Sequence, residues 1–330
     1  MSFAMPPRER TAEGSLRRVG FELEFAGLEP GRTADIVATV TGGRAVAGGP
    51  FGFRVENTAH GDWQVELDAT VLRDRKYLEL LERLGIDVRG VEMLPRIEEW
   101  IMRAAGTVVP CEITSPPIPL DNLELIDELR GELQRNEALG TRSRVTFAFG
   151  LHINPEAPGT DPGTVLSFLR AFLLLNPWIR SESDIDLARR IAPFIKEFPP
   201  AYRQLVLGAD YGPGLQQLID DYLAHNPTRN RPLDLLPLLA HIDEARVRAH
   251  AAEPQLLKPR PAFHYRLPNC LIDDPEWRIA HEWRYWVEIE RIAGDEARLA
   301  AMCAEALRYD ESPLPFAGGG WTERVRDWVS

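Results

Sequence analysis

The feature that most constrains the fold is an alternation of apolar and polar side chains that recurs in five short segments. Successive side chains of a β-strand point to opposite faces of a sheet, so each segment predicts a strand with one apolar and one polar face. The polar faces carry Glu22 and Glu24 of VGFELEF; Gln64, Glu66 and Asp68 of WQVELDA; Glu112 and Thr114 of CEIT; Thr146, Ala148, Gly150 and His152 of VTFAFGLHI; and His264 and Arg266 of FHYRL. Together the five segments predict a sheet that is buried on one side.

The polar faces are selective in the residue types they carry. Taken singly, each is typical of an ordinary half-buried strand with a wet second face, and for any one strand this interpretation stays open. Together they hold carboxylates, histidines and an arginine, and few Lys, Ser or Thr. Two carboxylates ~4 Å apart on neighbouring strands repel by roughly 4 kcal/mol at an effective dielectric of about 20, and a divalent cation resolves this conflict. Oxygen ligands with one or two imidazoles and no thiolate indicate Mg²⁺ or Mn²⁺, held with phosphate oxygens and water.

The order of strand and helix signals predicts an α+β fold in one catalytic domain. Residues 1–16 are expected to form a flexible segment before a single domain over 17–330. That domain divides into a strand-rich part (17–155), a helical part (156–257), and a returning strand with C-terminal helices (258–330). Strands are expected at Arg18–Ala26, Asp35–Thr41, Phe51–Glu56, Trp63–Val71, Thr107–Thr114, Arg144–Ile153 and Ala262–Cys270. Helices are expected at Tyr77–Leu84, Val91–Ala105, Asn122–Leu139, Pro162–Leu175, Asp184–Lys196, Pro213–Ala224, Leu233–Ala240, Pro275–Ile292 and Glu296–Leu307, with a tail helix after Gly320. This order favours an antiparallel sheet with helices packed on one face.

Charge and composition disfavour several classes of protein. Lys and Arg number 38 against 50 Asp and Glu, so the formal net charge of −12 argues against nucleic acid and anionic membranes as partners. The N-terminal residues lack the apolar core of a secretory signal, and the longest apolar stretch, Val165–Ile179, is too short to span a bilayer. Three cysteines without metal-ligand spacing are typical of reduced thiols. We therefore expect a cytoplasmic protein, and the sequence leaves open whether it forms a homo-oligomer.

Four of the segments also match, in order, the motifs of a known enzyme family. VGFELEFAG resembles an opening G-x-E-x-E strand, and WQVELDAT resembles a second metal-bearing strand. VPCEITSPPI is similar to an E-I-x-S-P-P element, and FGLHINPE is similar to a G-x-H segment. The family that carries these motifs is the amidoligases, relatives of glutamate–cysteine ligase and glutamine synthetase. Order and rough spacing agree over residues 17–156, and a looser likeness covers 226–290.

The sequence departs from the family pattern at two places. Asp68 is followed by Ala-Thr, where the family usually has Gly-Ser. The best counterpart of a Glu-aromatic-Arg strand is His264-Tyr265-Arg266, in which His264 replaces the expected carboxylate. This second departure puts the last metal position of the family in doubt.

The resemblance implies a glutamine-synthetase-like fold and an ATP-dependent reaction. In that fold a curved antiparallel sheet carries helices on its convex face, while its concave face binds Mg²⁺ (or Mn²⁺) between ATP and the substrate. The implied enzyme is a carboxylate–amine ligase that forms an amide through an acyl phosphate, with an amino acid, a peptide or another small molecule as substrate. Carried over by position, the metal or ATP-phosphate residues are Glu22, Glu24, Asp68, Glu112 and His152.

Cationic side chains are expected to clamp the transferred phosphoryl group, because guanidinium forks match phosphate oxygens. Arg266 is the first candidate, because it shares a strand face with His264. The expected catalytic residues are Arg266, Arg229 and Arg231, and the expected ATP-binding residues are Arg266, Lys258 and His264. Solvated loop arginines are the alternative interpretation for the NPTRNRP segment. Arg260 is a weaker candidate, and Glu66 is expected behind the metal ligands.

Three other functions are compatible with the same residues. A metal-dependent amide hydrolase would use the carboxylate–histidine face without ATP. A catalytically silent binding or scaffold protein would keep the fold, and the replacement at His264 is the feature that favours it. A phosphoryl transferase of the guanidino-kinase type would form no amide. The retained pair Glu22 and Glu24, with Glu112 and His152, favours the ligase over the silent protein.

Overall fold

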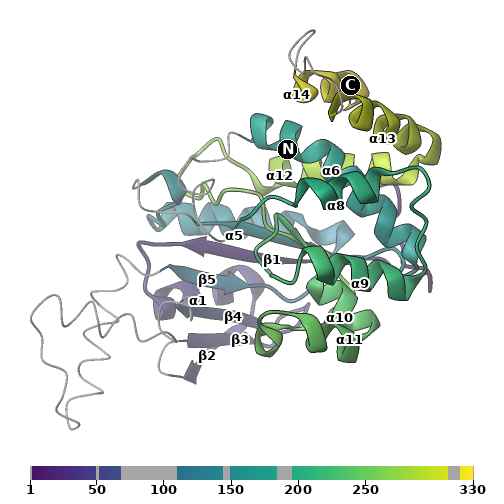
Figure 1. Ribbon diagram of the computed structural model, residues 1–330. Coiled ribbons are helices and arrows are strands. Elements are labelled where there is room, and N and C mark those ends of the chain that lie inside the picture. Colours follow the sequence, from purple (N-terminus) through teal and green to yellow (C-terminus); the bar gives the residue numbers. More distant parts are fainter. Residues whose placement is uncertain are drawn as a thin grey trace, which may run out of the picture.

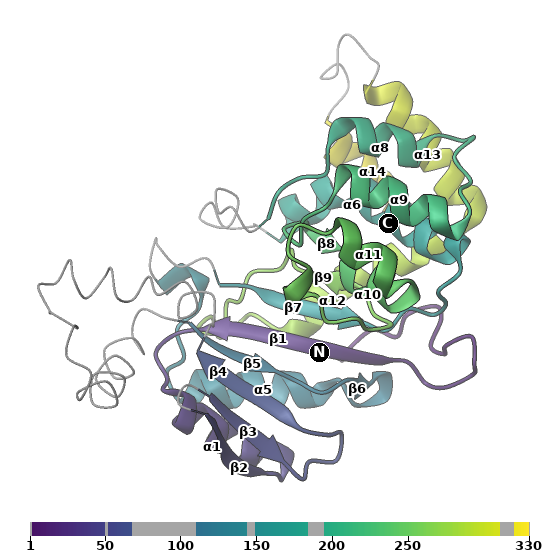
Figure 2. The same cartoon turned by 60° about the horizontal axis from the view of Figure 1, so that its bottom comes forward.

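The chain combines a sheet with a large helical part, shown from two directions in Figures 1 and 2. In this computed structural model the described residues are 2–49, 52–67, 110–143, 149–183, 195–310 and 320–329. The strands are β1 Arg18–Phe25, β2 Arg44–Gly49, β3 Gly52–Glu56, β4 Trp63–Leu67, β5 Cys111–Thr114, β6 Ile118–Pro119, β7 Leu151–Pro155, β8 Leu233–Asp234 and β9 His264–Tyr265. The helices are α1 Pro30–Thr41, α5 Glu124–Arg135, α6 Pro162–Glu182, α8 Pro200–Leu207, α9 Leu215–His225, α10 Leu236–Ile242, α11 Glu244–His250, α12 Ile279–Gly294, α13 Glu296–Asp310 and α14 Trp321–Val329.

Strand β1 lies in the middle of an antiparallel sheet. The strand order is β2-β3-β4-β5-β1-β7-β9-β8, and β6 pairs with the start of β1. All pairs of strands among the described residues are antiparallel. β1 therefore has β5 on one side and β7 on the other; Figure 2 shows α5 behind β4 and β5, and α1 beside β2, β3 and β4. The two glutamates of β1 consequently stand at the centre of the sheet.

The apolar face of β1 forms part of the hydrophobic core. Its residues Val19, Phe21, Leu23 and Phe25 are at most 1% exposed and alternate with half-exposed polar positions, as the sequence predicts. They belong to one core cluster that includes buried side chains of α1, α5, α6 and α12. Complete burial of a side chain of this size contributes about 1.5–3 kcal/mol to stability. The apolar face is thus fixed against helices, and the polar face is left for chemistry.

The strand predicted over Asp35–Thr41 is wrong, because α1 covers this segment. Its β-branched residues imitate a strand, but Pro30 occupies the first turn and Gly42 ends the helix with a left-handed φ of 71°. These are the start and stop signals of a helix. The buried residues of α1 are Pro30, Thr33, Ala34, Ile36 and Val37. Four of them follow the three- and four-residue spacing of one helix face, and this face packs on β2, β3 and β4.

The helical part is built around α6, which is longer than predicted. The helix continues past Pro177 to Glu182, although proline removes a backbone hydrogen-bond donor. Apolar residues on both sides of Pro177, between Leu173 and Ile179, are buried and hold this part of the helix in the core. Helices α12, α13 and α14 pack against α6. Figure 1 shows α13 and α14 at the end of the molecule away from β2. Helices α8 and α11, which the sequence did not predict, complete this part.

Two segments near the sheet edge differ from their predicted structure because of proline. The helix predicted over Leu233–Ala240 is divided into β8 and α10, and Pro237 stands in the first turn of α10. The strand predicted over Ala262–Cys270 is limited to β9, with isolated bridges at Ala262 and Asn269. Pro261 and Pro268 flank β9, and proline cannot donate to a ladder.

Several predicted features lie outside the described residues. They are the helices Tyr77–Leu84 and Val91–Ala105, most of the helix Asp184–Lys196, the ends of the strands predicted around residues 68–71, 107–109 and 144–148, and the candidate ligand Asp68.

The segment before β1, for which flexibility is expected, contacts α12. Phe3 is buried in the core, and the indole of Trp283 donates to the carbonyl oxygen of Ala4 at 2.7 Å. Directly after this segment, Arg17 donates two hydrogen bonds of 2.7 Å to the carboxylate of Glu290 in α12. Both side chains are 1% exposed. The N-terminal strand and a C-terminal helix are therefore joined by a buried ion pair.

The observed fold class agrees with the sequence in its main features. The chain is a mixed α and β protein with a large open antiparallel sheet. A curved, glutamine-synthetase-like form with helices on the convex face stays a prediction. Among the helices of the described ranges, none combines the length and the hydropathy that crossing a membrane requires.

Candidate functional site

Three carboxylates share one row across the polar face of the sheet. The strand register places Glu24 of β1 opposite Glu112 of β5, and Glu112 opposite Glu66 of β4. Directly opposed side chains have Cβ atoms about 4.5–5.5 Å apart, so the three negative charges are neighbours. All three residues are half-buried. The hydroxyl of Thr114 donates to Glu112 at 3.1 Å, and the backbone amide of Gly150 donates to Glu24 at 2.7 Å.

The next row brings Glu22 of β1 to His152 of β7. The two residues are register partners, and Oε2 of Glu22 lies 2.9 Å from Nδ1 of His152. The other ring nitrogen of His152, Nε2, lies 3.6 Å from Oε1 of Glu24. The imidazole of His152 therefore stands between the two carboxylates of β1.

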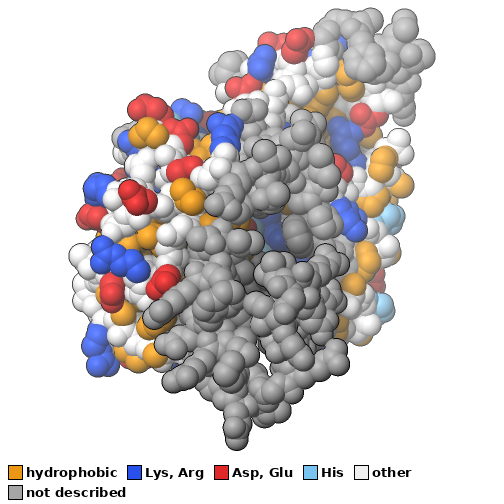
Figure 3. All heavy atoms as spheres, turned by 90° about the vertical axis from the view of Figure 1, so that its left-hand side faces the viewer, with side chains coloured by type: hydrophobic (Ala, Val, Ile, Leu, Met, Phe, Trp, Pro, Cys, Tyr) orange, Lys and Arg blue, Asp and Glu red, His pale blue; other side chains and the backbone are white. Residues whose placement is uncertain are grey.

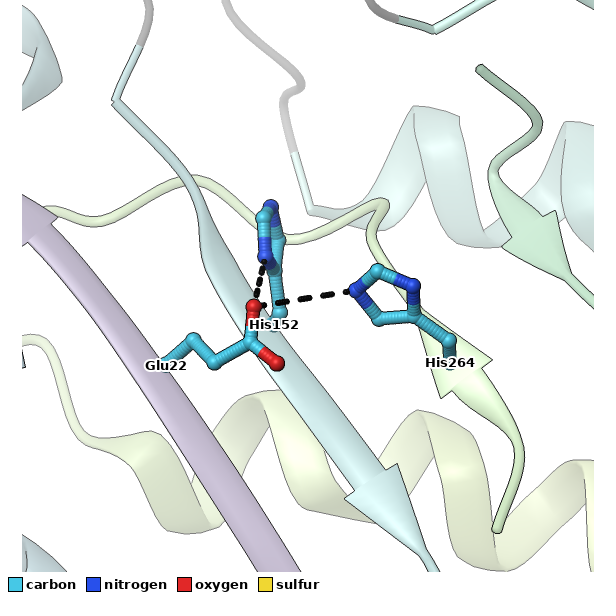
Figure 4. Close-up of side chains that lie close together, drawn as sticks. All are labelled: Glu22, His152 and His264. Atoms are coloured by element: carbon cyan, nitrogen blue, oxygen red, sulfur yellow. Dashed lines mark hydrogen bonds and ion pairs between the residues drawn. The ribbon is translucent and has the colours of Figure 1, made fainter. Parts of the chain in front are cut away.

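A second histidine approaches the same carboxylate from β9. Nε2 of His264 lies 3.8 Å from Oε2 of Glu22, and the rings of His152 and His264 meet edge to face with centroids 5.2 Å apart. Figure 4 shows the three side chains pointing toward one another from β1, β7 and β9. Nδ1 of His264 lies 3.3 Å from Oδ2 of Asp234 in β8, which is completely buried.

The other oxygen of Glu22 is held by two nitrogen donors. Asn154 of β7 donates to Oε1 at 3.0 Å, and Nη2 of Arg260 lies 3.4 Å from the same oxygen. The guanidinium of Arg260 also donates to the amide oxygen of Asn154 at 2.8 Å. This contact fixes the orientation of the carboxylate, so that Oε2 faces the imidazoles.

Burial and neighbouring groups set the charge states of this cluster. Burial by itself would raise the pKa of Glu22, but the interactions with His152 and His264 outweigh it and hold this pKa well below its usual range. Burial lowers the pKa of His152, and the hydrogen bond with Glu22 and the charge of Glu24 offset only part of this effect. At neutral pH we therefore expect an ionised Glu22 beside a neutral imidazole, the forms that bind a metal ion.

The donor set fits a divalent cation. One ligand atom each from Glu22, His152 and His264 lies within 4.8 Å of the others. The adjacent row adds the carboxylates of Glu24 and Glu112. On the face shown in Figure 3, basic side chains are visible in a recess near the centre, and acidic and basic side chains are interspersed elsewhere among the described residues. The arrangement can bind a cation and an anion side by side.

One protein-family model covers the part of the chain that contains this site. The family model described as "Putative amidoligase enzyme" matches residues 15–288. This range contains β1, β5, β7 and β9, and with them each residue of the cluster. The chain belongs to this amidoligase family. Neither the curated proteins nor the solved structures give a significant match.

The amidoligase structure brings most of the predicted metal residues together. Glu22, Glu24, Glu112 and His152 lie on three adjacent strands of one sheet face. His264, expected among the ATP-binding residues and aligned with the last metal position of the family pattern, lies against Glu22. Asp68 follows β4 and lies outside the described residues.

The predicted cationic residues are more dispersed. Arg266 follows β9, its charge helps to lower the pKa of His152, and its guanidinium donates to the carbonyl oxygen of Arg229 at 2.6 Å. Arg231 is turned to the helical part, where it donates to carbonyl oxygens of Lys196, Glu197 and His225 and lies over the ring of Phe198. Lys258 is exposed, and no contact described for this chain joins it to Glu22. Within the described ranges, the arginine found in contact with Glu22 is Arg260.

Three residues contribute to the site more than the sequence predicts. Asn154 follows His152 by two positions and shares its face, a signal that period-two alternation could have supplied. Arg260 was ranked as a weak candidate and contacts both Glu22 and Asn154. Asp234 stands in a two-residue strand, too short for an alternation signal, and reaches the site only through its pairing with β9.

Proposed function

We propose that this amidoligase is an ATP-dependent carboxylate–amine ligase that activates its carboxylate as an acyl phosphate. Family membership supports a ligase-type enzyme. ATP dependence, Mg²⁺ and a substrate of the amino acid or peptide class are the further parts of the proposal. A cytoplasmic location agrees with the composition of the chain.

The observation that carries the proposal is the row Glu24–Glu112–Glu66 beside the Glu22–His152 pair. A merely solvated sheet face has no reason to oppose carboxylates directly, because like charges opposite each other destabilise a sheet. At a separation of ~4 Å and an effective dielectric of ~20, each close pair costs roughly 4 kcal/mol. Divalent cations offset this repulsion and hold phosphate oxygens in the same region.

The residues present fit the implied cations. Glu22, Glu24, Glu112 and His152 would hold them, with Glu66 next to Glu112 in the row. Bound divalent cations and ATP supply charge neutralisation and the phosphoryl group that turns a carboxylate into an acyl donor. The oxygen-rich row of Glu24, Glu112 and Glu66 suits Mg²⁺, which prefers oxygen ligands.

Of the cations that the structure describes, Arg260 and Arg266 are well placed to bind anionic oxygens at this site. Arg260 lies against Glu22, and Arg266 lies near His152. Guanidinium groups stabilise charge that develops on transferred phosphoryl oxygens. The chain's own contribution is therefore positioning and charge, because phosphoryl transfer needs little covalent help from the protein.

The test follows phosphate release and product mass together. Purified protein is incubated with ATP, Mg²⁺ and a pool of amino acids and short peptides. We expect substrate-stimulated phosphate release and a condensed product whose mass is that of two pool members less one water. Glu24→Gln and Glu112→Gln keep side-chain size but remove charge, and each should lower the rate by at least ~10²-fold, the scale of removing one stabilising electrostatic contact.

Glu132→Gln is the matched control, because Glu132 stands on α5 behind the sheet in an exposed ion pair with Arg135. It should keep the wild-type rate. Amide cleavage with metal and no nucleotide would replace the ligase by the hydrolase. Absence of phosphate release, together with no effect of ATP and Mg²⁺ on the melting temperature, would favour the silent protein.

A further inference from the structure

His264 is oriented by a buried carboxylate behind it. The imidazole is 2% exposed, and its Nδ1 lies 3.3 Å from Oδ2 of Asp234, which is completely buried. The second oxygen of Asp234 accepts a hydrogen bond from the backbone amide of Leu236 at 3.0 Å, so the carboxylate cannot rotate freely. A carboxylate that accepts from one ring nitrogen is the usual arrangement behind a metal-binding histidine.

This contact determines which nitrogen of His264 is available. Because Asp234 accepts, Nδ1 carries the hydrogen, and Nε2 presents its lone pair. Nε2 is buried and has no hydrogen-bond partner, and it faces Oε2 of Glu22 at 3.8 Å. The Nε2 lone pair and a carboxylate oxygen then face each other, which is unfavourable unless a cation lies between them.

The remaining contacts leave one carboxylate oxygen for such a cation. Oε1 of Glu22 is engaged by Asn154 and Arg260, whereas Oε2 faces both imidazoles. His152 adds the third ligand, and the donor atoms of Glu22, His152 and His264 lie within 4.8 Å of one another. The site therefore offers two nitrogens and one oxygen, with further positions open to water or substrate oxygens.

We propose that Glu22, His152 and His264, with Asp234 behind His264, form a subsite that binds a first-row transition-metal dication of the Mn²⁺ or Zn²⁺ class in preference to Mg²⁺. Imidazole suits transition metals, whereas Mg²⁺ requires oxygen ligands and gives up its water reluctantly. The amidoligase motifs that this sequence resembles imply a carboxylate where His264 stands, so His264 supplies the second nitrogen on which the preference depends. The inference deepens the proposed function, because it adds a second kind of metal ion to the site. Binding of this ion does not depend on the proposed function; only its use in the ligation reaction does.

The test measures metal binding without nucleotide. Protein freed of metal with a chelator is titrated separately with Zn²⁺, Mn²⁺ and Mg²⁺ by calorimetry, and the Mn²⁺ complex is examined by pulsed electron paramagnetic resonance. We expect one site that binds Zn²⁺ and Mn²⁺ at least ~10-fold more tightly than Mg²⁺, with two directly bound nitrogens. His264→Glu restores the family's carboxylate and should leave one bound nitrogen and a smaller preference over Mg²⁺. Asp234→Asn should weaken Zn²⁺ binding ~10–100-fold, the effect of losing a carboxylate behind a metal-binding histidine.

His241→Asn is the matched control, because His241 is exposed on α10, and it should bind metal like the wild type. Circular dichroism confirms that each variant is folded. Equal affinities for Mg²⁺ and Mn²⁺ in the wild type, or an unchanged nitrogen count in His264→Glu, would overturn the inference. Ligation with Mg²⁺ alone and no transition-metal site would refute this inference and leave the proposed function intact. A nitrogen-bound metal ion in a protein that catalyses no ligation would support this inference and refute the proposed function.

Discussion

Replacing Glu290 by Gln tests how strongly one buried ion pair joins the two ends of the domain. Arg17 donates two hydrogen bonds of 2.7 Å to the carboxylate of Glu290, and both side chains are 1% exposed. Removing one partner of a buried pair costs about 3–5 kcal/mol, because the other charge stays buried and unneutralised. Arg17 keeps its bond of 2.7 Å to the carbonyl oxygen of Glu156, and the glutamine oxygen can still accept one bond. We therefore expect a loss at the lower end, about 3 kcal/mol.

The assay is urea unfolding at neutral pH, followed by circular dichroism and tryptophan fluorescence. Glu182→Gln is the control, because Glu182 pairs with Arg326 at side-chain exposures of 34% and 56% and should change the free energy of unfolding by less than about 1 kcal/mol. High salt should reduce only the exposed pair's contribution. In a double-mutant cycle, Arg17→Met with Glu290→Met should cost less than the two single changes together. The reasoning is refuted if Glu290→Gln costs no more than Glu182→Gln, or if the two Met changes are additive.

Three further predictions concern backbone conformation, buried hydroxyls and pH. Gly27→Ala should destabilise the protein more than Gly42→Ala. Both positions have a positive φ, which costs about 1–2 kcal/mol for residues other than glycine. A Cβ at Gly27 would also meet a backbone oxygen and a leucine carbon at 2.9 Å, whereas a Cβ at Gly42 meets nothing within 4 Å. Thermal unfolding of the two variants compares them. Tyr202→Phe should leave the free energy of unfolding in urea unchanged or raise it, because the buried hydroxyl of Tyr202 has no hydrogen-bond partner. Tyr222→Phe should lower it by about 1–3 kcal/mol, because the hydroxyl of Tyr222 accepts from a buried backbone amide at 3.1 Å. Equal effects of the two substitutions would contradict this reasoning. Burial raises the pKa of the Cys111 thiol from its ordinary 9.0 to about 12. Below pH 9.0 the thiol is protonated in both the folded and the unfolded protein. Between pH 9.0 and about pH 12 only the unfolded chain loses the proton. Stability should therefore fall across that range by up to ~1.4 kcal/mol per pH unit, and Cys111→Ala, compared by urea unfolding in the presence of EDTA, should fall less steeply.

The centre of the sheet and its polar face could be predicted from sequence because period-two alternation is local. The segment of β1 places four core residues and two glutamates on opposite faces without information from elsewhere in the chain. The same argument gave Glu112 and His152 their faces. It failed at Asp35–Thr41, where β-branched residues imitate a strand and the decisive signals are Pro30 and Gly42 at the helix ends.

The parts that the sequence did not predict depend on contacts between distant segments. Asp234 reaches His264 only because a two-residue strand pairs with β9. Arg231 and Arg266 were both predicted to bind the phosphoryl group, but the structure places them differently. Arg231 donates to carbonyl oxygens of the helical part, whereas Arg266 lies near His152. Loop arginines have no periodicity that separates these outcomes, so charge type alone could not rank Arg260 above Arg231.

The central position of β1 also determines when the cluster can assemble during synthesis. β1 emerges first, but Glu22 contacts His152, which lies 130 residues further along the chain. The hairpin of β2 and β3 needs only neighbouring residues, whereas closing the middle of the sheet must wait for β7. His264 follows much later still. A nascent chain therefore offers an incoming metal ion at first one carboxylate, then a carboxylate with one imidazole, and the complete set only after β9 has been made.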